Sequence, residues 1–289
     1  MALDSATARA RIEEIPDLPT LPMVVQQILT MANSANTSAT DVGELIERDQ
    51  VLTSKVLRLV NSAYYGFPQQ IKTVHHAIVI LGFSKVKNVA LTASVFDLTR
   101  SWDSASLDIP RYWEHSLGTA LAAQAVAHRV AQQVAPDEVY VGALLHDFGK
   151  VILNQYFADE YRQVVQAALD NHTLLRSMEK ELLGFDHQQV GTWTMERWNL
   201  PPALVSGVRY HHNPNLASGS REMAGCVHLG DIFARALGIG NGGDPSIPPI
   251  NASLVDQYRL GKAFYEELLL IVYDEARRAG DFFNLIRHP

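Results

Sequence analysis

Cysteine is almost absent from this sequence of 289 residues, and long apolar runs and basic clusters do not occur in it. The single cysteine, Cys226, excludes an internal disulfide framework and is typical of a reducing compartment. No stretch reaches about 18 uncharged apolar residues, the length that would predict a membrane-spanning helix. The formal net charge is -7, which argues against a nucleic-acid-binding surface. The first residues lack the apolar core of a signal peptide, so we expect a cytoplasmic protein whose partners include neither nucleic acid nor a membrane.

Apolar residues recur at helical spacing along most of the chain, and no segment has the pattern of a strand. In the N-terminal third, Thr40 or Asp41 is expected to cap one helix, Thr53 to begin another, and Thr73 to cap a helix that Gly82 ends. The polar segment 97–110 is the best boundary between parts, and the Gly- and Pro-rich segment 238–250 is predicted to be a flexible excursion. We therefore predict an all-α fold in three parts. These are an N-terminal helical subdomain (1–100), a metal-binding subdomain (101–240) and a C-terminal helical extension (241–289) that docks back.

The stretch 142–150, GALLHDFGK, places His146 beside Asp147 where an apolar helix is expected to end. Gly149 is predicted to be the left-handed residue that closes this helix. Ionisable groups at a buried helix end must be paired or bind a metal, because an isolated buried charge is too costly. By itself the dipeptide is weak evidence for ligands, so the interpretation depends on other histidines and aspartates.

Five further residues are candidate metal ligands, and all but His187 have an ordinary alternative: His115, His187, His211, His212 and Asp231. His115 lies near the start of a long helix predicted over about 111–134, where a lone histidine is more often a core residue. A capping box of Asp186 with Gln189 predicts a helix that begins at His187. His211 and His212 end a helix, where they could simply interact favourably with its dipole. Asp231 lies on an otherwise buried helix face, where a carboxylate needs a cation or hydrogen-bond donors.

Three segments resemble the HDOD proteins of bacterial signalling: residues 18–22 (LPTLP), 49–66 (DQVLTSKVLRLVNSAYYG) and 77–82 (AIVILG). The resemblance covers roughly residues 15 to 240. It implies an all-helical N-terminal subdomain packed on a helical subdomain related to the HD phosphohydrolases. Many members of the family are regulatory or output modules with incomplete metal ligands.

The order of the histidines and aspartates also resembles the ligand signature of the HD phosphohydrolase superfamily. This resemblance implies one ion held by His115, His146, Asp147 and Asp231, and a second held by His187, His211 and His212. Imidazole and carboxylate ligands without a thiolate favour Fe or Mn, with Ni, Co and Zn as alternatives, over a structural zinc site. Lys150 resembles the lysine that meets substrate phosphate in the HD-GYP enzymes; the alternative is a surface lysine at a helix end.

Two functions remain open. The first is a non-catalytic signalling module whose metal site is structural or senses a ligand; the family's general character favours it. The second is a metal-dependent phosphohydrolase or phosphodiesterase acting on a nucleotide or cyclic nucleotide, with Asp147 and Lys150 as its catalytic residues. The complete ligand set favours this alternative, but the segment 213–219 lacks the Gly-Tyr-Pro loop of the HD-GYP enzymes. No receiver, kinase or cyclase pattern occurs in the sequence, so we expect signalling proteins as partners and a nucleotide or phosphoester as a candidate ligand.

Overall fold

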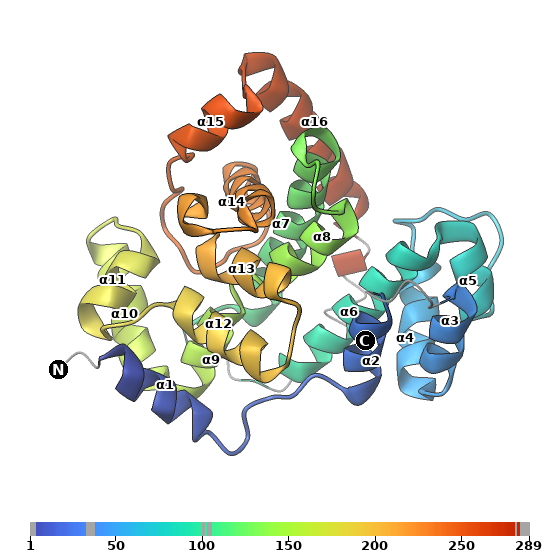
Figure 1. Cartoon of the computed structure of the whole chain (residues 1–289), viewed down its shortest axis with the longest axis horizontal. Coiled ribbons are helices and arrows are strands. Elements are labelled where there is room, and N and C mark those ends of the chain that lie inside the picture. The colour runs from blue at the N-terminus through green and yellow to red at the C-terminus, as the bar shows by residue number, and fades with distance from the viewer. Residues whose placement is uncertain (1–3, 33–37, 100–101, 103–105, 281, 284–289) are drawn as a thin grey trace. The chain divides into compact units, whose positions relative to one another are not determined.

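The described residues are helical or lie in turns and loops, and no strand occurs among them. The computed structural model describes residues 4–32, 38–99, 102, 106–280 and 282–283 (Figure 1). The all-α prediction is confirmed. The chain forms two compact units, one of residues 1–18 with 101–274 and the other of residues 19–100 with 275–289. The three-part division into functional domains stays a prediction, and no helix among the described residues is long and apolar enough to cross a membrane.

The unit of residues 19–100 and 275–289 is built from short helices. They are α2 (Met23–Ala32), α3 (Ala39–Glu47), α4 (Gln50–Val60), α5 (Val74–Leu81) and α6 (Phe83–Thr99). Thr73 caps α5 and Gly82 ends it, as predicted. Two predicted starts were wrong: Ser38 caps α3 in a capping box with Asp41, and Asp49 caps α4, so that this helix begins three residues before Thr53.

The unit of residues 1–18 and 101–274 contains all the candidate ligands. Its helices up to the junction at residue 147 are α1 (Ser5–Glu13), α7 (Ile109–Val130) and α8 (Pro136–Leu145). Those that follow are α9 (Phe148–Tyr156), α10 (Ala158–Asp170), α11 (Leu175–Leu182), α12 (His187–Arg197), α13 (Pro202–Tyr210), the 3-10 helix η1 (Pro214–Leu216), α14 (Arg221–Ala236), α15 (Ala252–Tyr258) and α16 (Lys262–Arg278), whose last residues belong to the other unit.

Helices α7 and α14 pack against each other along their length (Figure 1). A Cβ atom on Gly230 would lie 2.6 Å from the Cβ of Ala123 and 2.8 Å from the carbonyl oxygen of Thr119. Only a glycine allows this approach, which brings the backbones of the two helices into contact. Because of it, His115 on α7 and Asp231 on α14 lie close enough to share a ligand.

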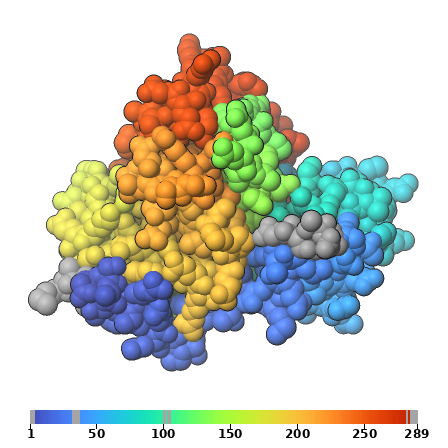
Figure 2. All heavy atoms as spheres, viewed as in Figure 1, coloured from blue at the N-terminus to red at the C-terminus, as the bar shows by residue number. Residues whose placement is uncertain are grey.

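Helices α9 and α12 approach equally closely, and here the sequence prediction for Gly149 was wrong. Gly149 is not a left-handed residue that closes a helix; it lies within α9, and a Cβ on it would collide with the carbonyl of His187 on α12. Its role is to let two helices touch. Helices α12 and α13 are also in contact, and their gold and orange surfaces adjoin in Figure 2.

Candidate metal centre

The structure brings all seven predicted ligands into one buried cluster in two groups. The His115 group contains His115, His146 and Asp231, and the His187 group contains Asp147, His187, His211 and His212. Within each group, one candidate ligand atom from each residue lies within 4.8 Å of the others. Six of the seven residues are buried, and His212 is half-buried.

The ligands are contributed by ordinary helix positions and helix ends. His115 lies in the second turn of α7, and Asp231 lies in the buried part of α14. His146 and Asp147 form the two-residue junction between α8 and α9. His187 is the first residue of α12, after the predicted capping box of Asp186 with Gln189. His211 and His212 follow the end of α13.

Asp147 faces both groups, one carboxylate oxygen to each. Its Oδ1 lies 3.3 Å from His187 Nε2 and 3.6 Å from His211 Nε2. Its Oδ2 lies 3.3 Å from His146 Nε2 and 3.8 Å from His115 Nε2. A carboxylate placed in this way has the geometry of a bridge between two ions.

Several buried atoms of the cluster have no hydrogen-bond partner among the described residues. They are the Nε2 atoms of His115, His146 and His211 and the oxygens of Asp147, although Lys150 forms an ion pair with Oδ2. Folded proteins rarely leave buried polar atoms in this state, and a bound ion is one way of satisfying them. The residues therefore fit a metal centre of nitrogen and oxygen ligands.

Hydrogen bonds on the far side of each ring direct Nε2 into the cluster. The Nδ1 atoms of His146 and His211 lie 2.7 Å from the Ala143 carbonyl and 2.8 Å from the Val208 carbonyl. Since a carbonyl only accepts, each Nδ1 carries a proton, and when the ring is neutral its lone pair is on Nε2. Partners of this kind orient the ligands of a metal.

Glu179 on α11 does the same for His187, and sequence reasoning missed it. Its Oε2 lies 2.6 Å from His187 Nδ1 and also accepts the backbone N–H of His187 at 3.0 Å. Its Oε1 accepts the hydroxyl of Tyr161. Glu179 is completely buried, so its carboxylate depends on these donors.

His212 completes the His187 group from its exposed side. Its Nε2 lies 3.0 Å from that of His187. Burial lowers its pKa well below the ordinary value, and the neighbouring His211 and His187 lower it further. A neutral imidazole interacts only weakly with a helix dipole, so the dipole alternative explains His212 poorly.

The pKa values in the metal-free cluster diverge. Burial lowers the pKa of His146, but the charges of Asp147 and Asp231 outweigh burial and raise it to about 9. Burial lowers the pKa of His211 to about 4, with the Asp147 hydrogen bond opposing it. Burial raises the pKa of Asp147, but His146 and Lys150 outweigh burial and hold it well below its ordinary range. An ion that binds here must therefore displace a proton from His146 near neutral pH.

Two buried cations and a third carboxylate surround the His115 group. Lys150 is not the surface lysine of the alternative interpretation: it is fully buried, with its Nζ 2.7 Å from Asp147 Oδ2. Arg235 donates from Nε to Asp231 Oδ1 at 2.6 Å. Asp244 pairs with both cations, at 3.4 Å from Lys150 and 2.9 Å from Arg235. Arg235 and Asp244 were not among the sequence candidates.

The segment 238–247, which is part of the excursion predicted over 238–250, packs over this group. The Asn241 amide donates to the Arg111 carbonyl, and Gly242 is buried with its carbonyl accepting from Lys150 at 2.9 Å. A Cβ on Gly242 would lie 3.0 Å from His115 Nε2. A pocket of about 310 Å³ opens here, lined mainly by this segment together with His115 and Arg235.

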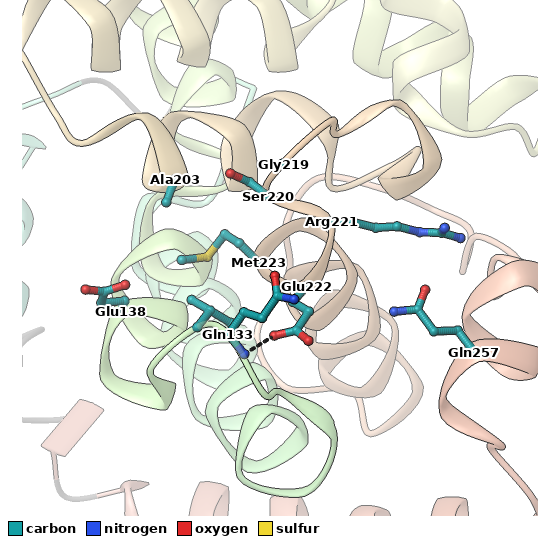
Figure 3. A pocket seen from close by; sticks show the side chains of 10 residues that line it. Gln133, Glu138, Ala203, Gly219, Ser220, Arg221, Glu222, Met223 and Gln257 are labelled. Carbon is teal, nitrogen blue, oxygen red and sulfur yellow. Dashed lines mark hydrogen bonds between the residues drawn. The ribbon is translucent and has the colours of Figure 1, made fainter.

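A second pocket, of about 360 Å³, draws no residue from either ligand group (Figure 3). One of its two acidic residues, Glu222, accepts hydrogen bonds from the backbone amides of Gln132 and Gln133, at 3.0 and 2.7 Å. The Glu222 carboxylate therefore holds the segment between α7 and α8 in place, and we assign the pocket no ligand.

The model of the HDOD domain family matches residues 18–214, which include every candidate ligand except Asp231. A curated relative from Treponema pallidum, described only as an uncharacterized protein, is 22% identical over 222 residues, 76% of this chain. This chain spans only 42% of the length of that relative.

Solved structures share the fold over almost the whole chain. An HDOD domain protein of unknown function from Geobacter sulfurreducens is 27% identical, with a TM-score of 0.82 over 96% of this chain and 97% of that one. A proposed signal transduction protein from Marinobacter aquaeolei is 22% identical, with a TM-score of 0.80 over 98% of this chain and 67% of that one. A proposed phosphohydrolase from Shewanella amazonensis is 21% identical, with a TM-score of 0.72 over 96% of each chain. The last two similarities show the fold alone.

Proposed function

Because this chain belongs to the HDOD family, we propose that it is a signalling protein with an intact two-ion centre that senses a phosphorylated ligand. The observation that carries this proposal is Asp147: each of its two oxygens lies close to the Nε2 atoms of two histidines, and three of these four Nε2 atoms have no hydrogen-bond partner among the described residues. One ion would be held by His115, His146, Asp147 and Asp231, and the other by Asp147, His187, His211 and His212. The protein that delivers or receives the signal would be a separate signalling partner.

The donor set favours Fe or Mn, with Ni, Co and Zn as alternatives, because it combines imidazoles with carboxylates and no thiolate. Bound ions would lower the pKa of a water and attract phosphoryl oxygens. Other residues of the protein would hold the ligands in position: Glu179 fixes the ring of His187, and Arg235 holds Asp231.

Phosphoester hydrolysis is the second candidate function, and one observation favours it. His212 is half-buried, so the His187 group also has a ligand that a substrate can approach. In this case Asp147 and Lys150 would be catalytic, as the resemblance to the HD-GYP enzymes implies. A thiolate mechanism is a poor rival, since burial raises the pKa of Cys226 to about 12.

Metal content tests the proposal. We expect full-length protein purified without added metal to contain about one to two transition-metal ions per chain, and chelation to lower its thermal stability. Protein that remains free of metal after incubation with each of the five metals would refute it.

A substrate panel separates the two functions. Nucleotides, cyclic mono- and dinucleotides and an aryl phosphodiester are assayed with each metal, in the wild type and in Asp147→Ala. Turnover that disappears in Asp147→Ala would establish the enzyme. Metal-loaded protein that binds phosphate but turns over none of these substrates would leave the sensing function.

A further inference from the structure

Lys150 is fully engaged by the protein, which limits what else it can bind. An ammonium group has three protons. The Nζ atom lies 2.7 Å from Asp147 Oδ2, 2.9 Å from the Gly242 carbonyl and 3.4 Å from Asp244 Oδ2. With no exposed surface and three acceptors, it links the α8–α9 junction to the segment 238–247.

Arg235, in contrast, has a hydrogen-bond donor group that no described residue uses. Its Nε donates to Asp231, and its Nη1 donates to the Ser246 carbonyl at 3.3 Å and pairs with Asp244. Its Nη2 has no hydrogen-bond partner within the part of the chain that the structure describes, although the side chain is only 8% exposed. Arg235 also lines the pocket of about 310 Å³ beside His115.

The charges around the cluster require an anion once metal is bound. The cluster and its surroundings contain four carboxylates, Asp147, Asp231, Asp244 and Glu179, and two cations, Lys150 and Arg235. When the histidines are neutral, as they are when they bind metal, the net charge of these six groups is −2. Two divalent ions would change the net charge to +2. A buried excess charge is costly unless it is paired.

We propose that Arg235, rather than Lys150, is the side chain that binds an anionic ligand at the His115 group, through Nη2. The ligand is a phosphoryl oxyanion, either free phosphate or the terminal group of a phosphomonoester, because a guanidinium edge suits tetrahedral oxyanions. Asp244 is a positioning residue that pairs with Nη1 and so fixes the guanidinium group beside the pocket. The inference rests on the proposed function, since the anion is drawn there by bound metal.

The experiment is calorimetric titration of the full-length, Mn²⁺-loaded protein with inorganic phosphate and, separately, with phenyl phosphate. We expect Arg235→Gln to weaken phosphate binding at least about tenfold, the order of a charge-assisted hydrogen bond. The phosphate affinity of Arg235→Lys should be intermediate, because lysine keeps the positive charge but lacks the planar set of donors of a guanidinium group. The matched control is Arg111→Gln, which removes an exposed arginine that contacts the same segment, and we expect its affinity to change by less than about twofold. Equal losses for both probes identify the phosphoryl group as the ligand; a loss for phenyl phosphate alone identifies a phosphomonoester.

Variants that retain metal keep the inference falsifiable. Arg235→Gln/Asp244→Asn removes the charge pair together, and we expect it to keep metal, measured by elemental analysis, while losing phosphate. Three results would overturn the inference: unchanged phosphate affinity in metal-loaded Arg235→Gln, phosphate loss in metal-loaded Lys150→Gln alone, or metal loss in every Arg235 variant. Failure of the proposed function is a different result, namely wild-type protein that holds no metal.

Discussion

Gly242→Ala adds a single methyl group beside the candidate metal centre without altering any of the seven candidate ligands. The new Cβ would lie 2.8 Å from His115 Cδ2, 3.0 Å from His115 Nε2 and 3.3 Å from Asp147 Oδ2, whereas ordinary contact begins at 3.4 Å. Gly242 has no left-handed backbone to strain, so the effect of the substitution is one of space. We expect Gly242→Ala to weaken the binding of the ion in the His115 group.

The size of the effect follows from the overlap. The His115 ring and the added methyl group must separate by 0.4 to 0.6 Å. Overpacking of this kind costs about 1–3 kcal/mol. A bound ion would hold the His115 ring in place, a restraint that the metal-free protein lacks, so the larger part of the cost falls on the metal-bound state. At tenfold for each 1.4 kcal/mol, affinity for this ion should fall about 5- to 150-fold.

The assay is competition with a chelating dye, together with elemental analysis and thermal unfolding of the metal-free protein. We expect metal content to fall from about two ions per chain toward one, with little change in metal-free stability. Gly261→Ala is the control, because a Cβ there meets nothing within 4 Å. Wild-type metal affinity in Gly242→Ala, or an equal loss in Gly261→Ala, would refute the reasoning.

Three other substitutions test other parts of the cluster. Asp147→Ala should reduce metal content far more than Lys150→Ala does, because Asp147 faces both groups; equal losses by elemental analysis would show that the roles are misassigned. Glu179→Gln should weaken metal binding about 10- to 100-fold in chelator competition by loosening His187, while Glu181→Gln, an exposed neighbour on α11, should not. Burial raises the pKa of Asp186, but the charge of His187 and the hydrogen bond from Arg176 to Asp186 outweigh burial and lower this pKa. The ionised carboxylate therefore stabilises the fold at pH values above 3.8, the ordinary pKa of the group. This stability is lost as the pH falls through the lowered pKa of Asp186 in the folded protein. In urea unfolding of metal-free protein, the difference between wild type and Asp186→Asn should therefore shrink between about pH 5 and pH 3, and a difference independent of pH would contradict this.

Local rules predicted the features that depend on neighbours in the sequence. The capping box of Asp186 with Gln189 begins α12 where it was expected, and this places His187 in the first turn. Thr73 and Gly82 bound α5 for similar reasons. The start of α3 was missed because Thr40 and Asp41 are also good caps, and only the hydrogen bonds of Ser38 decide between them.

The residues that were missed act through contacts between distant segments. Arg235 lies in the last turn of α14, where a basic residue is ordinary, and Glu179 lies on a short polar helix. Asp244 follows four glycines of the segment 238–243, which has the composition of a loop. No periodicity marks any of the three, and each matters only because the fold brings it to a histidine or a cation.

The two-residue junction between α8 and α9 limits where residues can be inserted into the chain or deleted from it. Residues 139–145 of α8 are all buried up to His146, and α9 begins directly after Asp147. Removing one residue from α8 would rotate the preceding part of the helix by about 100° relative to Asp147. The buried apolar residues of α8 would then be partly exposed. The connections at 131–135 and 217–220 contain exposed residues and lie outside both ligand groups. Insertions and deletions that keep the centre intact should therefore occur in those connections and not near the junction.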